Sequence, residues 1–264
     1  MAPDAREVAV AAARRAGALL VGQLGGPRHV EFKTGPTNLV TDMDRRAEAA
    51  VVETLRAHYP DDAVLSEEAG HLAGSAGRRW IVDPLDGTTN YASGIPVFAV
   101  SIALEVDGRT VLGVVHDPTR DECFVAERGR GAHLGGRPLH VSDTGRLEAS
   151  VLATGFAYTI RQDRDTNLPE HDLLSLRGRA VRAIGSAALS LAWVAAGRLD
   201  GFWELVLGAW DVAAGALLIE EAGGRVTDRG GGALDPDAPA PVASNGRIHD
   251  EMLAALAEAR RAAR

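Results

Sequence analysis

Cysteine is almost absent from this chain of 264 residues, since Cys123 is the only one. A single cysteine excludes a disulfide framework within the chain and fits a reducing cytoplasm. No apolar run approaches the roughly 20 residues that a membrane span requires. Arg14 and Arg15 interrupt the apolar N-terminal stretch where a signal peptide would lie. We therefore expect a cytoplasmic protein without a membrane partner.

Positive charge is scarce relative to negative charge. Lys and Arg together number 28 against 36 Asp and Glu, so the formal net charge is -8. An acidic surface is unfavourable for nucleic acid or an anionic membrane, and we expect no nucleic-acid partner. A small anionic substrate is still compatible with this balance, because bound cations can reverse the local field.

The hydrophobic content of 46% is enough to bury a substantial core, and we expect one compact unit made of two halves. Residues 1–145 predict an α+β half. A helix begins after Asp4 and stops before residues 25–27, residues 31–40 form an extended loop, and a second helix begins near Thr41.

Strand patterns dominate the rest of the first half. Apolar runs predict strands at 63–65, 80–82, 97–106, 110–116, 122–126 and around 139–141, with a hairpin turn at 107–109. Residues 146–264 predict an α/β half instead. Strand patterns at 150–153, 180–184, 199–203 and 241–244 alternate there with helix patterns at 187–196, 211–222 and 250–261.

The most informative segment is residues 83–91, which read DPLDGTTNY and follow an apolar strand directly. Pro84 lacks a backbone donor and restricts the residue before it, which leaves the Leu85 carbonyl free to join Asp83 and Asp86 as an oxygen ligand. Mg²⁺ binds about six oxygens, and carboxylate and carbonyl ligands suit Mg²⁺ or Mn²⁺ better than zinc. Residues 87–89 add backbone N–H groups and hydroxyls that could hold a phosphate.

Each acidic residue has a simpler structural interpretation when it is taken alone. An isolated Asp-x-x-Asp is more often a turn cap than a metal site. Glu67 and Glu68 fit a solvated strand edge, and Asp211 fits the N-cap of an apolar helix. The full nine-residue string favours the ligand interpretation for Asp83 and Asp86.

Four motifs together resemble the inositol monophosphatase family of metal-dependent, lithium-sensitive phosphomonoesterases. They stand in the family's order and span almost the whole chain: residues 38–41 with Asp44, 66–68, 83–91 and 210–215. The resemblance implies an α/β fold with α+β character. This is the layered αβαβα sandwich of the inositol monophosphatase and fructose-1,6-bisphosphatase type, and the family is commonly homodimeric.

The resemblance also implies a set of metal ligands. These are Glu67, Asp83, the Leu85 carbonyl, Asp86 and Asp211, which would hold two or three Mg²⁺ ions with Mn²⁺ as a substitute. Asp83 would bridge two ions, and Glu67 would also face a third, weaker site.

The remaining implied roles concern catalysis and the substrate. Thr88, supported by Asp44, would orient the attacking water, with Glu67 as a further catalytic group. The amides of Gly87 and Thr88 would hold the phosphate. The substrate would contact Glu204, Ala187 and Asp211, and Lys33 would lie on a mobile loop near the metals.

The expected activity is Mg²⁺-dependent hydrolysis of a small phosphate monoester by metal-activated water, giving an alcohol and inorganic phosphate. Inositol monophosphate is the leading substrate. Histidinol phosphate, a sugar bisphosphate, a nucleotide phosphate or an intermediate of specialised metabolism are alternatives, and a non-catalytic binding or regulatory relative is another. Residues 207–209 lack the Lys or His that many family members carry before the Trp, so the outer pocket wall is less basic.

Overall fold

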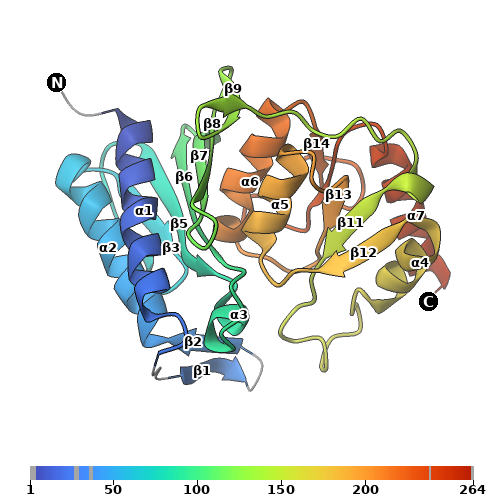
Figure 1. Cartoon of the computed structure of the whole chain (residues 1–264), viewed down its shortest axis with the longest axis horizontal. Coiled ribbons are helices and arrows are strands. Elements are labelled where there is room, and N and C mark those ends of the chain that lie inside the picture. The colour runs from blue at the N-terminus through green and yellow to red at the C-terminus, as the bar shows by residue number, and fades with distance from the viewer. Residues whose placement is uncertain (1–3, 27–29, 36–37, 238, 263–264) are drawn as a thin grey trace.

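The computed structural model describes residues 4–26, 30–35, 38–237 and 239–262, which fold into five layers that alternate helices and sheets (Figure 1). The helical layers are, in order, α1 (Ala5–Gln23) with α2 (Asp42–His58), α5 (Ala187–Ala195) with α6 (Ala209–Glu221), and α4 (Leu168–Arg177) with α7 (His249–Ala262). The expected layered αβαβα sandwich is confirmed.

The first sheet has eight strands and is almost wholly antiparallel. Its order is β10-β9-β8-β7-β6-β5-β3-β4, and β3 and β5 form its one parallel pair among the described strands. The strands are β3 (Ala63–Ser66), β4 (Gly70–Leu72), β5 (Arg78–Asp86), β6 (Ala99–Val106), β7 (Arg109–Asp117), β8 (Glu122–Glu127), β9 (Gly131–Leu134) and β10 (Arg137–Pro138). The predicted hairpin turn between β6 and β7 has positive φ at Asp107 and Gly108.

The second sheet has five strands in the order β12-β11-β13-β15-β14. The strands are β11 (Val151–Thr154), β12 (Ala180–Ala183), β13 (Gly201–Trp203), β14 (Arg225–Thr227) and β15 (Val242–Ser244). β11 runs parallel to both of its neighbours, and the other pairs are antiparallel. The short helix α3 (Thr88–Ala92) follows β5 directly.

The middle helices join the two sheets into one core. Alternation along β5 places Trp80 and Val82 in the cluster with α1 and α2, and Ile81 in the cluster with α5 and α6. A Cβ on Gly113 of β7 would lie 2.8 Å from the Ala214 carbonyl oxygen, so glycine lets α6 approach this sheet closely. The start of α6 is thereby fixed near the end of β5.

Several sequence expectations differ from the structure. The described parts of residues 31–40 form a hairpin, β1 (Val30–Gly35) and β2 (Asn38–Thr41), rather than an extended loop. The strand expected around 139–141 lies slightly earlier, as β10 at 137–138, because the chain leaves the first sheet after Leu139 and the amide of Val141 bonds to the end of α6 at Ala222. Helix α4 was not expected.

No helix within the described ranges combines the length and the apolar content needed to cross a bilayer.

Candidate active site

The motif at 83–91 forms the end of β5 and the turn into α3. The pairing of β5 with β6 is irregular between Asp83 and Asp86, which lets the chain bend there. The amide of Leu85 donates to Asp83 Oδ1 over 2.9 Å, and Gly87 has a φ of 99°. A Cβ on Gly87 would also lie 3.0 Å from the Gly185 carbonyl oxygen, so this position favours glycine on both grounds.

Two carboxylates of this turn meet a third from a distant part of the chain. Asp83, Asp86 and Asp211 each offer an oxygen, and these oxygens lie within 4.8 Å of one another. They line a cavity of about 540 Å³ that Glu67 and Leu85 also line. Glu67 follows β3, and its amide bonds to the Val82 carbonyl over 3.3 Å, so the β3–β5 pairing carries it to the cavity.

The acids are buried together without compensating positive charge among the described lining residues. Burial first, and then the neighbouring Glu67, Asp86 and Asp211, raise the pKa of Asp83 well above its usual value. Burial also raises the pKa of Asp86 to about 6, and burial with the nearby acids raises that of Asp211 to about 8. Such mutual repulsion indicates a place for cations.

The donor set fits a hard divalent cation. It consists of carboxylate and carbonyl oxygens, and none of the described residues that line the cavity is Cys or His. Oxygen donors of this kind suit Mg²⁺ or Mn²⁺ better than zinc.

The carboxylate of Asp86 is oriented from the second half of the chain. Ser186 Oγ and the amide of Ala188 donate to Oδ2, the latter over 2.9 Å, and the amide of Ala187 donates to Oδ1 over 3.2 Å. These donors are the N-cap residue and first turn of α5. The start of α5 thus fixes one acid and brings Ala187 to the cavity wall.

Thr88 is positioned by a cap on another helix. Its hydroxyl donates to Asp44 Oδ1 over 2.8 Å and lies 3.1 Å from the Leu85 carbonyl oxygen. The other oxygen of Asp44 accepts from the amide and the hydroxyl of Thr41, the N-cap residue of α2. Asp44 therefore closes the α2 capping box and holds Thr88 with the same carboxylate.

Asp211 stands one turn deeper than an N-cap. The N-cap residue of α6 is Gly208, whose amide donates to Asp211 Oδ2 over 2.6 Å. The sequence interpretation of Asp211 as the N-cap is wrong, because the N-cap lies three positions earlier in the chain. Its carboxylate still caps the helix through that amide and faces the other acids at the same time.

Glu204 lies just after β13 and lines the same cavity. Burial, followed by repulsion from Asp211 and Asp86, raises its pKa to about 8. A Cβ on Gly155 would overlap the Glu204 carboxylate, so glycine makes room for it. Lys33 belongs to β1, and its side chain lies outside the described part of the structure.

Sequence reasoning missed several residues of this site. Ser186 could have been found as an N-cap, because a serine precedes the apolar helix pattern. Tyr158 lines the cavity with 48% of its surface exposed, and partial burial together with the acids raises the pKa of its phenol. Neither Tyr158 nor Gly155 carries a local signal, since both lie in an irregular segment.

Comparisons with known proteins find relatives in sequence and in fold over nearly the whole chain. A family model described as the inositol monophosphatase family matches residues 3–262. The chain is 45% identical over 249 residues to the Nus factor SuhB of Escherichia coli K12, covering 94% of this chain and 93% of that one. It is 43% identical over 253 residues to an inositol-1-monophosphatase of Synechocystis, covering 95% and 88%. The solved inositol monophosphatase of Anabaena matches with a TM-score of 0.87 at 42% identity, covering 96% and 95%.

Proposed function

The chain belongs to the inositol monophosphatase family of phosphomonoesterases, and we propose that it hydrolyses a small phosphate monoester with Mg²⁺ as its cofactor and Mn²⁺ as a substitute. Inositol monophosphate is the leading substrate. The observation that carries the proposal is the meeting of Asp83, Asp86 and Asp211 in one cavity. Three carboxylates that repel one another in a cavity large enough for a small metabolite suit a metal-dependent hydrolase.

The chain's own groups divide the work between binding and orientation. Glu67, Asp83, Asp86, Asp211 and the Leu85 carbonyl would hold two or three Mg²⁺ ions. When bound, these ions would neutralise the phosphate dianion and lower the pKa of the attacking water.

Thr88 can accept a hydrogen bond from a water through its oxygen only if its own hydrogen points elsewhere. Its bond to Asp44 Oδ1 supplies that direction, which leaves a Thr88 lone pair free to orient the attacking water. The amides of Gly87 and Thr88 would hold the phosphate oxygens, because both residues line the cavity. No covalent phosphoenzyme is needed in this scheme.

The substrate choice follows from the cavity wall. Glu204 accepts hydrogen bonds and Ala187 leaves space, which suits an alcohol with several hydroxyls. No Lys, Arg or His occurs among the described residues that line the cavity, so a second phosphate would find no cation there. Sugar bisphosphates and nucleotide phosphates are therefore weaker candidates than inositol monophosphate. Histidinol phosphate stays an alternative, because Glu204 would also accept from an ammonium group.

The proposal extends to location and assembly. We place the enzyme in the cytoplasm, without a membrane or nucleic-acid partner, and as a homodimer. The support is the single cysteine, the net charge of -8 and the family. The second candidate function is that of a Nus factor. It is favoured by the 45% identity to the Nus factor SuhB of Escherichia coli K12.

The decisive test is hydrolysis of inositol 1-phosphate and p-nitrophenyl phosphate with Mg²⁺ and after chelation. We expect release of inorganic phosphate that requires the metal. Asp83→Asn should lower kcat by more than about a hundredfold, because the charge stabilisation contributed by bound metal amounts to several kcal/mol. Near-normal turnover by this variant, or none by the wild type on any phosphate monoester, would reject the proposal and leave the second candidate.

A further inference from the structure

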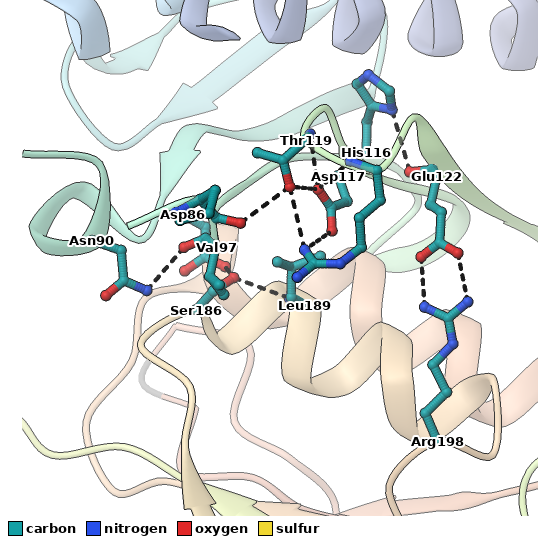
Figure 2. A network of polar contacts seen from close by, with 12 residues as sticks. Asp86, Asn90, Val97, His116, Asp117, Thr119, Glu122, Ser186, Leu189 and Arg198 are labelled. Carbon is teal, nitrogen blue, oxygen red and sulfur yellow. Dashed lines mark hydrogen bonds and ion pairs between the residues drawn. The ribbon is translucent and has the colours of Figure 1, made fainter. Parts of the chain in front are cut away.

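Asn90 lies in α3 and joins two segments that are far apart in sequence. Its Nδ2 donates to the carbonyl oxygens of Val97 and Ile184, each over 2.9 Å, and lies 3.3 Å from that of Gly185. Figure 2 shows the amide directed at Val97, beside Asp86 and Ser186. Because all three neighbours are acceptors, the bonded atom is the amide nitrogen rather than the oxygen.

The contact between Asn90 and the turn before α5 is tight. A Cβ on Gly185 would lie 2.8 Å from Asn90 Nδ2, and Gly185 has a φ of 79°. A Cβ on Gly87 would in turn lie 3.0 Å from the Gly185 carbonyl oxygen. Gly87 and Gly185 thus let the turn at 184–185 lie directly against the motif at 83–91.

The next residues of the same turn hold Asp86. Ser186 Oγ and the amides of Ala187 and Ala188 donate to its carboxylate, immediately after the carbonyls of Ile184 and Gly185 that Asn90 binds. A carboxylate ligand that is fixed by hydrogen bonds keeps its geometry toward a metal. We propose that Asn90 is a positioning residue, which sets the 184–188 turn so that this turn orients Asp86 toward a divalent cation.

This inference rests on the proposed function, since it concerns the same site. It assigns no contact with substrate or metal to Asn90. Its effect travels through the turn, and the amide provides an anchor that only a side chain with a donor at this reach can supply.

Thr119 offers a matched control, because it lies beside residues 96–97, one of the two segments that Asn90 contacts. Thr119 Oγ1 lies 3.1 Å from the Pro96 carbonyl oxygen, next to the Val97 carbonyl that Asn90 binds. The amide and the hydroxyl of Thr119 both donate to the buried Asp117, the hydroxyl over 2.8 Å (Figure 2). Thr119→Val therefore removes a buried polar contact beside residues 96–97 and none of the hydrogen bonds of the 184–188 turn.

The experiment measures Mg²⁺ and Mn²⁺ binding by calorimetry on the full chain, beside kcat and KM. We expect Asn90→Ala to weaken metal affinity by about 10-fold to 100-fold and to lower kcat, the range seen when groups behind a metal ligand are lost. Thr119→Val should keep the wild-type metal affinity. Asn90→Asp keeps the side-chain volume without the donor and should resemble Asn90→Ala, so it serves if Asn90→Ala does not fold.

The route through the turn is tested by a double-mutant cycle with Ser186→Ala. If Asn90 acts through Ser186, the double variant should lose less metal affinity than the sum of the two single losses. Additive losses would overturn the proposed route. Wild-type metal affinity in Asn90→Ala and Asn90→Asp would overturn the inference while leaving the enzyme assignment intact, whereas a wild type that binds no divalent cation would overturn the proposed function itself.

Discussion

Gly155 shows how the absence of a side chain decides the shape of the cavity wall. Its φ is not in the left-handed region, so glycine is not needed for the backbone. It is needed because a Cβ would overlap the carboxylate of Glu204. A property of this kind comes from a contact across 49 positions in the chain, and no local pattern reveals it.

We therefore expect Gly155→Ala to push Glu204 out of its place and to change substrate recognition. The KM for inositol 1-phosphate should rise by about tenfold, the equivalent of one lost hydrogen bond. The KM for p-nitrophenyl phosphate, which has no hydroxyls for Glu204, should change little. Gly22→Ala is the control, because a Cβ there meets nothing within 4 Å and lies in α1. Equal KM changes for both substrates would argue against this role of Glu204.

The site residues divide by whether their signal is local. Asp83 and Asp86 could be predicted because a proline and a glycine in a short string mark a turn after a strand. The donors on Asp86 could not, since they arrive from 100 to 102 positions away. The sequence could place Asn90 in the motif but could not show what its amide binds.

Helix α2 illustrates how an element can serve stability and the site at once. Its start at Thr41 was predictable from an N-cap before an apolar stripe, and its stripe is buried at Ala47, Val51 and Leu55. The capping-box partner Asp44 also holds Thr88, which the helix pattern alone does not show. The β1–β2 hairpin was missed for the opposite reason, because a two-stranded pair with polar residues has a weak strand pattern.

The two functions of α2 should separate by mutation. Thr41→Ala removes the cap and should lower the free energy of unfolding by about 1 kcal/mol while most of kcat remains. Thr88→Val leaves the cap in place, removes the hydroxyl bound to Asp44, and should lower kcat strongly with a smaller effect on unfolding. Chemical denaturation and initial rates measure the two effects. Thr88→Val with full kcat would exclude Thr88 from orienting water.

The whole molecule brings its acids together from both ends of the fold. The change from a strand-rich to an α/β pattern near residue 145 was predictable from the residues, whereas the order of the layers was implied only by the resemblance to the family. The site exists only when α6 and the end of β5 lie side by side, which depends on close contacts such as Gly113 with Ala214. The free energy needed to bury these acids is consequently a property of the folded chain as a whole.

That burial gives stability a specific dependence on pH. Burial raises the pKa of Asp211 from 3.8 and that of Glu204 from 4.5, each to about 8. The folded chain therefore holds protons that the unfolded chain has lost, and stability falls as pH rises toward the folded pKa values. His249 acts in the opposite sense at lower pH, because burial lowers its pKa from 6.5 to about 4. The carboxyl groups therefore decide the trend alone only at pH values above 6.5, the pKa of His249 in the unfolded chain.

Between about pH 7 and about pH 9 we expect the melting temperature of the metal-free protein to fall, and to level off above the folded pKa values. Mg²⁺ should raise it, and more at the upper end of the window, because there the carboxylates bind cations without first losing protons. Asp211→Asn should flatten the pH dependence and reduce the effect of Mg²⁺, and an equal ionic strength of KCl is the control for screening. A melting temperature that rises with pH in chelator would show that these carboxyls are not held protonated in the metal-free fold. An equal response to KCl and MgCl₂ would show that Mg²⁺ acts by screening alone and not by binding the acids.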